Sequence, residues 1–472
     1  MPSDPLTPEA ARENATTLAA ALGIRAEEAA QALDLCILIT ADPADEVAGH
    51  IAGEVASLLS RTVRRVSMTD TTEVVAAELV IGSHTPRTGA ARVYVQVGAD
   101  RAVISRTVQA AARCEQVPKI LPGLIACYAS AAGLYHALGG VLPFGMPQTL
   151  TVEFSQLGID LTALAQPIDL ARTYLAGAGA IGNGFLWAAH HLDLRGQLEI
   201  VDDDRVDSGN LNRQVWFDVD DIGKPKADRL AARAQPFFPH LALVSRPARL
   251  QALAEKTDGP WLERLIVAVD SRRARRALQN EFPGEVFDAS TTDIREIVLH
   301  HNRQPTDAAC LSCIYEPDQE ELSREQHIAE HLGVSLDEVR SERISAACAQ
   351  GIAKRFPGLT AAHLEGTAYD SLFKRLCAEG ALRTLAGKRV IAPFAFVSVL
   401  AGTLLALELV RRPTGCAAQR DNYWRISPWH APLARRRVYR PRQPGCAFCG
   451  SSLLRRVNES IWHDRERQLT HA

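Results

Sequence analysis

The chain of 472 residues is 47% hydrophobic and 23% charged, with a formal net charge of −3. This length allows two or three domains, and the composition is that of a globular protein rather than a disordered or fibrous one. The small net charge gives no electrostatic reason to expect nucleic acid or a membrane surface as a partner. The first residues lack the basic and apolar segments of a secretory signal, so we expect a cytoplasmic protein with reduced cysteines.

Residues 1–165 show a faint α/β pattern. The run DLCILITADPADEVAGHIAGEVASLL, residues 34–59, predicts a strand, a turn and a helix. Asp42, Asp45 and Glu46 occupy the turn, where a nucleotide loop would need glycines, and their charges would repel phosphate. We interpret this part as a copy of the following unit that has lost its nucleotide loop. An unrelated α/β domain is the alternative.

Residues 166–315 alternate strand and helix more clearly. This alternation predicts a parallel sheet with right-handed crossovers. We expect strands at 172–179, 197–204, 242–250 and 264–270, and helices at 181–192 and 221–238.

Each half also contains one long apolar segment, at 120–140 and 390–407. The second is uncharged for 18 residues, which is the lower limit of a membrane span. Pro393 and Gly402 lie within it, and Glu408 follows directly. A helix buried between domains is therefore favoured over a span.

The remaining segments complete the predicted organisation. Residues 316–389 form a polar, helical insertion and crossover loop with few large apolar residues, which we expect to lie at the surface. Residues 390–450 return to the nucleotide-binding domain. Residues 451–472 are too short for another domain.

The motif GAGAIG contains Gly177, Gly179 and Gly182, between a predicted strand and a helix. In this context backbone N–H groups and the helix dipole bind phosphate. Asp202 ends the next strand, where a carboxylate can accept a hydrogen bond from a ribose hydroxyl. A nicotinamide-dependent oxidoreductase would share these features.

Further polar residues favour a site for a triphosphate over a site for a dinucleotide. Arg213 and Lys226 supply two cations, which a triphosphate under attack needs and a dinucleotide normally does not. Asn210 and Gln214 supply amide donors, and Asp270, at a strand end, is placed to hold Mg²⁺. The GxxxxGK[ST] motif is absent, which excludes a P-loop nucleotidase.

Two CxxC pairs point to a metal. Cys310 and Cys313 form the first pair, and Cys446 and Cys449 form the second. Two such pairs suit a tetrahedral Cys₄ zinc site, which is closed and therefore structural. The fold must bring them together, because 132 residues separate the pairs. A redox role for a single pair is the alternative.

The segments GAGAIG, IVDDDRVDSGNLNRQVWF, DIGKPKA and VAVDS resemble the adenylation domain of the ThiF/MoeB and ubiquitin-activating enzyme superfamily. The resemblance is strong over 171–315 and moderate over 377–450. It implies an α/β fold with two Rossmann-like ThiF-type units, the first degenerate and the second active, a helical insertion and a Cys₄ zinc knuckle. It also implies that ATP and Mg²⁺ activate the C-terminal glycine of a ubiquitin-like protein as an acyl-adenylate.

The resemblance assigns roles to individual residues. Asp202 and Asp204 would serve the ribose and metal region, and Asp270 would hold Mg²⁺. The residues that would bind the ATP phosphates are Asn210, Arg213, Gln214 and Lys226. Arg213, Lys226 and Asp270 would also be catalytic.

In members of the superfamily that form thioesters, a cysteine lies between the first CxxC and the long apolar helix. Cys377 lies there, and its CAEG run is similar to the family pattern. Lys374 and Arg375 precede it and favour the thiolate. Cys348 is the alternative nucleophile. An enzyme with no thioester cysteine would instead be a sulfur-carrier adenylyltransferase of the ThiF/MoeB type.

Two features depart from the family pattern. No ubiquitin-fold domain follows the second CxxC, so a conjugating enzyme would have to bind another surface. No clear N-terminal arginine motif is present to reach a γ-phosphate. The Ala- and Arg-rich, Lys-poor composition is typical of a bacterial protein.

Overall fold

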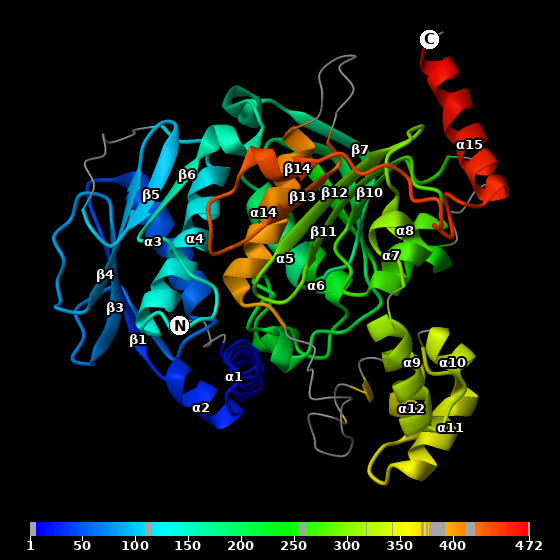
Figure 1. Cartoon of the computed structure of the whole chain (residues 1–472), viewed down its shortest axis with the longest axis horizontal. Coiled ribbons are helices and arrows are strands. Elements are labelled where there is room, and N and C mark those ends of the chain that lie inside the picture. Colours follow the sequence, from blue (N-terminus) through cyan, green and yellow to red (C-terminus); the bar gives the residue numbers. More distant parts are fainter. Residues whose placement is uncertain are drawn as a thin grey trace. The chain divides into compact units, whose positions relative to one another are not determined.

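The computed structural model describes residues 6–108, 116–253, 260–317, 319–341, 343–369, 372–373, 376, 392–411 and 421–470. The chain forms two compact units, residues 1–315 with 391–472 and residues 316–390. The larger unit holds both β-sheets, and the described part of the smaller unit is mainly helical (Figure 1).

The six-stranded sheet of the first half is parallel at one end and antiparallel at the other. Its strands, in spatial order, are β2 (Arg65–Ser67), β1 (Cys36–Ala41), β3 (Val75–Ile81), β4 (Ala91–Val97), β5 (Arg101–Ser105) and β6 (Thr149–Glu153). The pairs from β2 to β4 are parallel, and β5 and β6 continue antiparallel. The strand and helix expected at 34–59 are confirmed as β1 and α3 (Glu46–Leu59).

The eight-stranded sheet belongs to the second half. In spatial order its strands are β14 (Arg437–Val438), β13 (Tyr423–Ile426), β12 (Ile297–Arg303), β11 (Glu285–Thr291), β10 (Arg264–Val267), β7 (Ile168–Ala176), β8 (Leu194–Val201) and β9 (Leu241–Arg246). The predicted parallel sheet is confirmed from β9 to β11. The antiparallel strands β12 to β14 extend it into a mixed sheet, which the sequence pattern did not indicate.

The two sheets share one strand order. The series β2-β1-β3-β4-β5-β6 has the same succession of parallel and antiparallel pairs as β8-β7-β10-β11-β12-β13. In both halves a long apolar helix lies in the chain between the last two strands of this series: α4 (Ile120–Ala137) in the first and α14 (Ala395–Val410) in the second. The topology is that of a repeated α/β unit.

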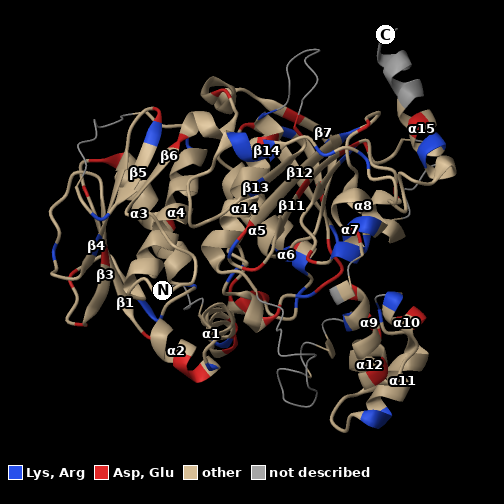
Figure 2. Ribbon diagram, in the orientation of Figure 1, with Lys and Arg blue, Asp and Glu red and all other residues tan. Residues whose placement is uncertain are grey.

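The two apolar helices are buried. Among the described residues α4 alone is long and apolar enough to cross a membrane, and 83% of it is buried inside the protein. It carries no charged residue and is tan throughout in Figure 2. The interpretation of the second apolar segment as a buried helix is confirmed by α14, which begins after Pro393 and packs against α4 and α5 (Ala180–Ala189).

Glycine allows α5 and α14 to approach closely. A Cβ at Gly402 would lie 2.2 Å from the carbonyl carbon of Gly184 and the nitrogen of Phe185. A Cβ at Gly184 would lie 2.7 Å from the carbonyl oxygen of Ser398. The contact therefore places α14 directly against the helix that follows the glycine loop.

The helix expected at 221–238 is shorter than predicted. It begins at Lys226 as α6 (Lys226–Ala234), with Pro225 as its N-cap. The residues before it form a separate 3₁₀ turn, Val219–Asp221, closed by a capping box from Asp218. The proline explains the boundary, because it disfavours helical geometry in the residue before it.

The smaller unit has a core of its own. The helices described in this unit are α9 (Gln319–Leu332), α10 (Leu336–Arg340), α11 (Ala346–Arg355) and α12 (Ala361–Leu364). Its buried side chains include Ile328, Leu332, Ile352, Leu364, Tyr369, Leu372 and Phe373. The prediction of an insertion poor in large apolar residues is therefore wrong, because these residues are spread among charged ones and form no continuous apolar run.

The other helices of the larger unit complete the described fold. They are α1 (Pro8–Leu22), α2 (Ala26–Leu33), α7 (Arg272–Gln279), α8 (Leu311–Ile314) and α15 (Ser452–Thr470).

Candidate functional site

The glycine loop joins β7 to α5, as predicted. Gly177 has φ of 105°, and a Cβ there would lie 2.7 Å from the carbonyl of Ala268. A Cβ at Gly182 would lie 2.1 Å from the carbonyl oxygen of Gly177. Both positions therefore require glycine. A Cβ at Gly179 would meet no atom within 4 Å, so this N-cap residue of α5 leaves open space where phosphate can approach.

Asp202 connects the end of β8 to this loop. Its Oδ2 accepts a 2.7 Å hydrogen bond from the backbone N–H of Ala178, and its Oδ1 accepts a 2.8 Å bond from that of Asp204. Burial raises the pKa of Asp202, and the neighbouring charge of Asp204 adds to the rise, whereas Lys226 opposes it. The loop and the two predicted carboxylates thus form one connected structure.

Lys226 lies at the first position of α6, beside these carboxylates. Its Nζ is 3.1 Å from Oδ2 of Asp204, and its backbone N–H donates a 2.9 Å bond to the carbonyl of Asp204. Burial lowers the pKa of Lys226, but the charges of Asp202 and Asp204 outweigh burial and leave it above the ordinary value. The ammonium is therefore positively charged at neutral pH.

The segment after β8 holds the remaining predicted phosphate ligands. Gln214 donates a 3.3 Å hydrogen bond to Oδ1 of Asn210, and its own Oε1 is buried with no hydrogen-bond partner in the described structure. Arg213 donates to Oδ1 of Asn212 at 2.7 Å and to the carbonyl of Gly209 at 3.2 Å. Burial lowers the pKa of Arg213, opposed by the charges of Glu13, Asp270 and Asp207.

Asp270 follows β10, which pairs in parallel with β7 in the register Val267↔Ala176. Its exposed side chain therefore leaves the same edge of the sheet as the glycine loop. Its charge also acts on Arg213 and Lys226. The structure thus gathers Asp202, Asp204, Lys226, Arg213 and Asp270 around this edge.

Asn183 belongs to the same site but was not identified from the sequence. Its Nδ2 donates to the carbonyls of Ala178 at 2.9 Å and Gly179 at 3.0 Å. Its Oδ1 accepts a 3.0 Å bond from the backbone N–H of Trp216. This fully buried amide links the glycine loop to the segment that carries Arg213 and Gln214. Its position as a polar residue on an otherwise apolar helix was the sequence feature that could have indicated a role in the site.

Residues of the first half also hold that segment. Asn212 donates a 2.7 Å hydrogen bond to Oδ1 of Asn14 in α1. Arg61, after α3, donates to the carbonyls of Leu211 and Val215, the second at 3.0 Å. Burial lowers the pKa of Arg61 to about 10. These contacts join residues about 150 to 200 positions apart, so no local pattern in the sequence indicated them.

The two CxxC pairs meet, as predicted. Four of the Sγ–Sγ distances are 3.7 Å for Cys310–Cys313, 3.8 Å for Cys310–Cys446, 3.7 Å for Cys313–Cys449 and 3.3 Å for Cys310–Cys449. All four are buried and free of disulfides. Thiolates bound to one Zn²⁺ at about 2.3 Å lie about 3.8 Å apart in a tetrahedron. The donor set and its spacing therefore fit zinc.

The predicted nucleophile Cys377 lies outside the described residues, as do Lys374 and Arg375. The alternative, Cys348, lies in α11 and is buried. Its Sγ donates to a carboxylate oxygen of Glu338 at 2.5 Å.

Comparison with known families identifies the family of the chain. Residues 156–448, more than half of the chain, match the ThiF family. The chain belongs to the ThiF family. Residues 7–160 match the E1 N-terminal domain. The resemblance to this superfamily that was inferred from the sequence is therefore confirmed.

Curated relatives of this ThiF-family chain match parts of it. "Uncharacterized protein y4jF" of Sinorhizobium fredii is 30% identical over 269 residues, 53% of this chain and 50% of that protein. The NEDD8-activating enzyme E1 catalytic subunit of Arabidopsis thaliana is 36% identical over 85 residues, 18% of each. Ubiquitin-like modifier-activating enzyme 7 of Homo sapiens is 34% identical over 110 residues, 22% of this chain and 11% of that protein. The chain thus spans half or less of the length of these relatives.

Solved structures of E. coli MccB also align with the chain. The structure with ATP covers 69% of this chain and 73% of that one, at 15% identity and a TM-score of 0.34.

The first half of the ThiF-family chain differs at the position of the glycine loop. Asp45 is the N-cap of α3 and accepts a 3.0 Å bond from the N–H of Ala48, and Asp42 accepts one from Ala44. The side chains of these acids therefore accept the backbone hydrogen bonds of the turn.

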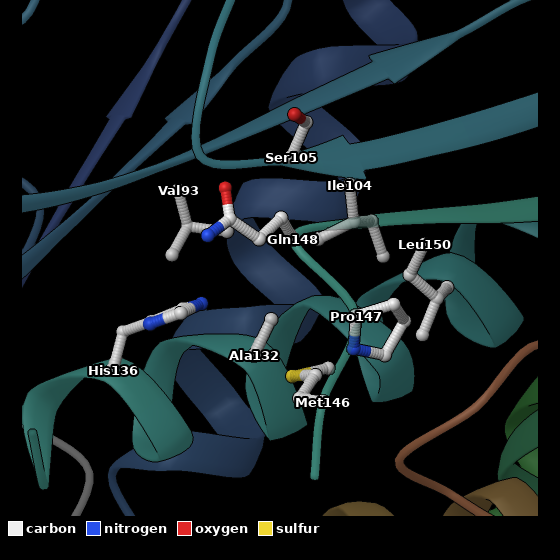
Figure 3. A pocket seen from close by; sticks show the side chains of 9 residues that line it. All are labelled: Val93, Ile104, Ser105, Ala132, His136, Met146, Pro147, Gln148 and Leu150. Carbon is white, nitrogen blue, oxygen red and sulfur yellow. The ribbon is translucent and has the colours of Figure 1, made fainter. Parts of the chain in front are cut away.

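A separate cavity in the first half lies between the sheet and α4. It is lined by Ile104, His136 and other residues and measures about 10 Å³ (Figure 3). That volume suffices for about one water molecule and excludes a nucleotide from this cavity.

The second half fits a nucleotide. Gly179 leaves room for phosphate at the start of α5, and Lys226 and Arg213 supply cations at the same edge of the sheet. Carboxylate oxygens of Asp202, Asp203 and Asp204 lie within 4.8 Å of one another, an oxygen donor set that suits Mg²⁺.

Proposed function

We propose that this ThiF-family chain uses ATP to adenylate the C-terminal carboxylate of a ubiquitin-like or related small protein. The observation that carries the proposal is the meeting of the Gly177–Gly182 loop, Asp202 and Lys226 at one edge of the second sheet. The names of the NEDD8-activating and ubiquitin-like modifier-activating relatives support a small-protein substrate, over the 85 and 110 residues that match.

In this reaction a carboxylate oxygen of the substrate attacks the α-phosphorus, and the bond to pyrophosphate breaks. The product is an acyl-adenylate, and the leaving group carries the negative charge. In this proposal Lys226 and Arg213 would stabilise that charge, and Asp270 would hold Mg²⁺. The open space at Gly179 allows backbone N–H groups to contact phosphate without steric hindrance.

A second step, in which Cys377 forms a thioester, belongs to the same proposal. The thiolate attacks the acyl carbon, and AMP leaves. Transfer to the cysteine of a conjugating enzyme would follow. The position of Cys377 in the sequence and the CAEG run support this step. We also propose a cytoplasmic location, in keeping with the reduced cysteines that the four-cysteine cluster requires.

Isotope exchange between pyrophosphate and ATP tests the first step. We expect exchange when the enzyme is given a ubiquitin-like protein with a free C-terminal glycine. The matched control is the same protein with that carboxylate amidated, which cannot attack phosphorus and should give no exchange. Equal exchange with both forms, or none with any small protein tested while ATP binds, would contradict the proposal.

A further inference from the structure

A second cluster of metal-ligating side chains lies away from the glycine loop and the four cysteines. His50 and Glu54 stand one helical turn apart on α3, so they share one face of that helix. His191 follows the C-cap of α5 in the second half. The ligand atoms of these three residues lie within 4.8 Å of one another, and Nε2 of His50 is 3.7 Å from Oε1 of Glu54.

The carboxylate of Glu54 is already oriented. Its Oε2 accepts a 2.6 Å hydrogen bond from the indole N–H of Trp187, whereas Oε1 faces His50. The residue is 8% exposed. Carboxylates that bind metals are usually held by such a hydrogen bond from outside the coordination sphere.

Among the three ligands, His191 has a ring nitrogen without a partner in the described structure. Its Nε2 is buried and has no hydrogen-bond partner within the described structure. An unsatisfied buried polar atom costs about 1–3 kcal/mol, and a metal–nitrogen bond would remove that cost.

Other titratable groups lie near these ligands. His190 stacks on His191 with ring centroids 3.8 Å apart, and its Nδ1 also lacks a hydrogen-bond partner within the described structure. The charge of Lys119 acts on His191, and that of Glu54 acts on the Cys127 thiol.

We propose that His50, Glu54 and His191 bind one divalent transition-metal ion, with Zn²⁺ the best match, and that this ion links the first half of the chain to the second. Two imidazoles and a carboxylate form a known three-residue zinc set, with water as the fourth ligand. Ligands bound to Zn²⁺ at about 2.0–2.1 Å lie about 3.4 Å apart in a tetrahedron, so small side-chain rotations complete the site. The inference is independent of the proposed adenylation.

Titration of the purified full chain with Co²⁺ tests the proposal. We expect one bound equivalent whose visible absorption lacks the thiolate charge-transfer bands of the four-cysteine cluster. His191→Ala should lose this equivalent. Trp187→Phe keeps all three ligands but removes the bond to Glu54, and it should weaken binding by about 10–100-fold. His430→Ala, an exposed histidine outside the cluster, is the matched control and should bind as the unchanged chain does.

Three further results decide the proposal. Zn²⁺ should raise the unfolding temperature of the unchanged chain and of His430→Ala but not that of Glu54→Gln, whose amide oxygen can still accept from Trp187. Equal Co²⁺ stoichiometry and affinity in the unchanged chain and in folded His191→Ala would overturn the proposal. So would a cobalt spectrum with thiolate bands alone.

Discussion

Asn212 donates a hydrogen bond of 2.7 Å to Asn14, and both side chains are fully buried. Nδ2 of Asn14 in turn donates to the carbonyl of Arg61, also at 2.7 Å. The guanidinium of Arg61 then reaches the carbonyls of Leu211 and Val215. The first half thus fixes the segment that carries the predicted phosphate ligands, without supplying a glycine loop of its own.

Replacing Arg61 by Ala should lower the rate of ATP–pyrophosphate exchange, chiefly through a higher KM for ATP, about tenfold. The substitution leaves buried carbonyls at 211, 215 and 217 without their donor, at about 1–3 kcal/mol for each unsatisfied group. Arg64→Ala is the control, because Arg64 pairs with Asp34 and Glu73 at the surface. Unchanged KM in a folded Arg61→Ala enzyme would show that the first half does not position the segment.

Lys226→Ala should reduce the rate of exchange by about 10²–10³, the usual cost of removing one donor to developing charge. Lys224→Ala offers a close control, since Lys224 is exposed and only two residues away. Arg213→Ala and Asp270→Ala should also reduce exchange. Retention of full exchange by Asp270→Ala would contradict the assignment of Mg²⁺ to that carboxylate.

Gly402→Ala should destabilise the larger unit by about 3 kcal/mol or more, because a Cβ there would lie 2.2 Å from backbone atoms of α5. Gly123→Ala is the matched control. Gly123 lies in α4, the other long apolar helix, and a Cβ there would meet no atom within 4 Å. That change should be neutral or stabilise by about 0.5–1 kcal/mol. Urea unfolding of the two variants measures the difference, and similar losses in both would argue against the close helix contact.

Cys446→Ser should lower the zinc content by one equivalent per chain and reduce the unfolding temperature, since a closed site loses one of four ligands. Elemental analysis of anaerobically prepared protein measures the first effect. Cys348→Ala, outside the cluster, should leave the zinc content unchanged. The Cys₄ zinc assignment fails if the unchanged chain contains no zinc at these cysteines.

Cys377→Ala should retain pyrophosphate exchange and lose the thiol-sensitive, higher-mass adduct between enzyme and small protein. Intact-protein mass spectrometry detects this adduct. If the adduct persists in Cys377→Ala and disappears in Cys348→Ala, the nucleophile is Cys348. If no cysteine variant changes product formation, the enzyme stops at the adenylate, as a sulfur-carrier adenylyltransferase would.

Much of the second half was predictable because its signals are local. The glycine loop, the strand that precedes Asp202 and each CxxC pair have signals that span only a few residues of sequence. The start of α6 differs from the prediction because Pro225 disfavours helical geometry in the residue before it. The core of the smaller unit was missed because its apolar residues occur singly among charged ones.

The part of the site supplied by the first half could not be predicted in this way. Asn14 and Arg61 carry no motif, and their partners lie 198 and 150 positions away in the sequence. Only the packing of α1 and of the turn after α3 brings them to residues 211–217. The sequence suggested a repeated α/β unit through the strand, turn and helix at 34–59, whereas the shared strand order of the two sheets is visible only in the topology.

The hydrogen bonds from Asn14 and Arg61 also couple the stability of the first half to ligand binding in the second half. A ligand that binds only when residues 208–217 are ordered stabilises every interaction on which that order depends. Backbone amides of α1 should then exchange more slowly with deuterium when ATP is bound, although α1 lies in the half without the glycine loop. The rate of hydrogen exchange in the first half therefore reports whether ATP occupies the site in the second half.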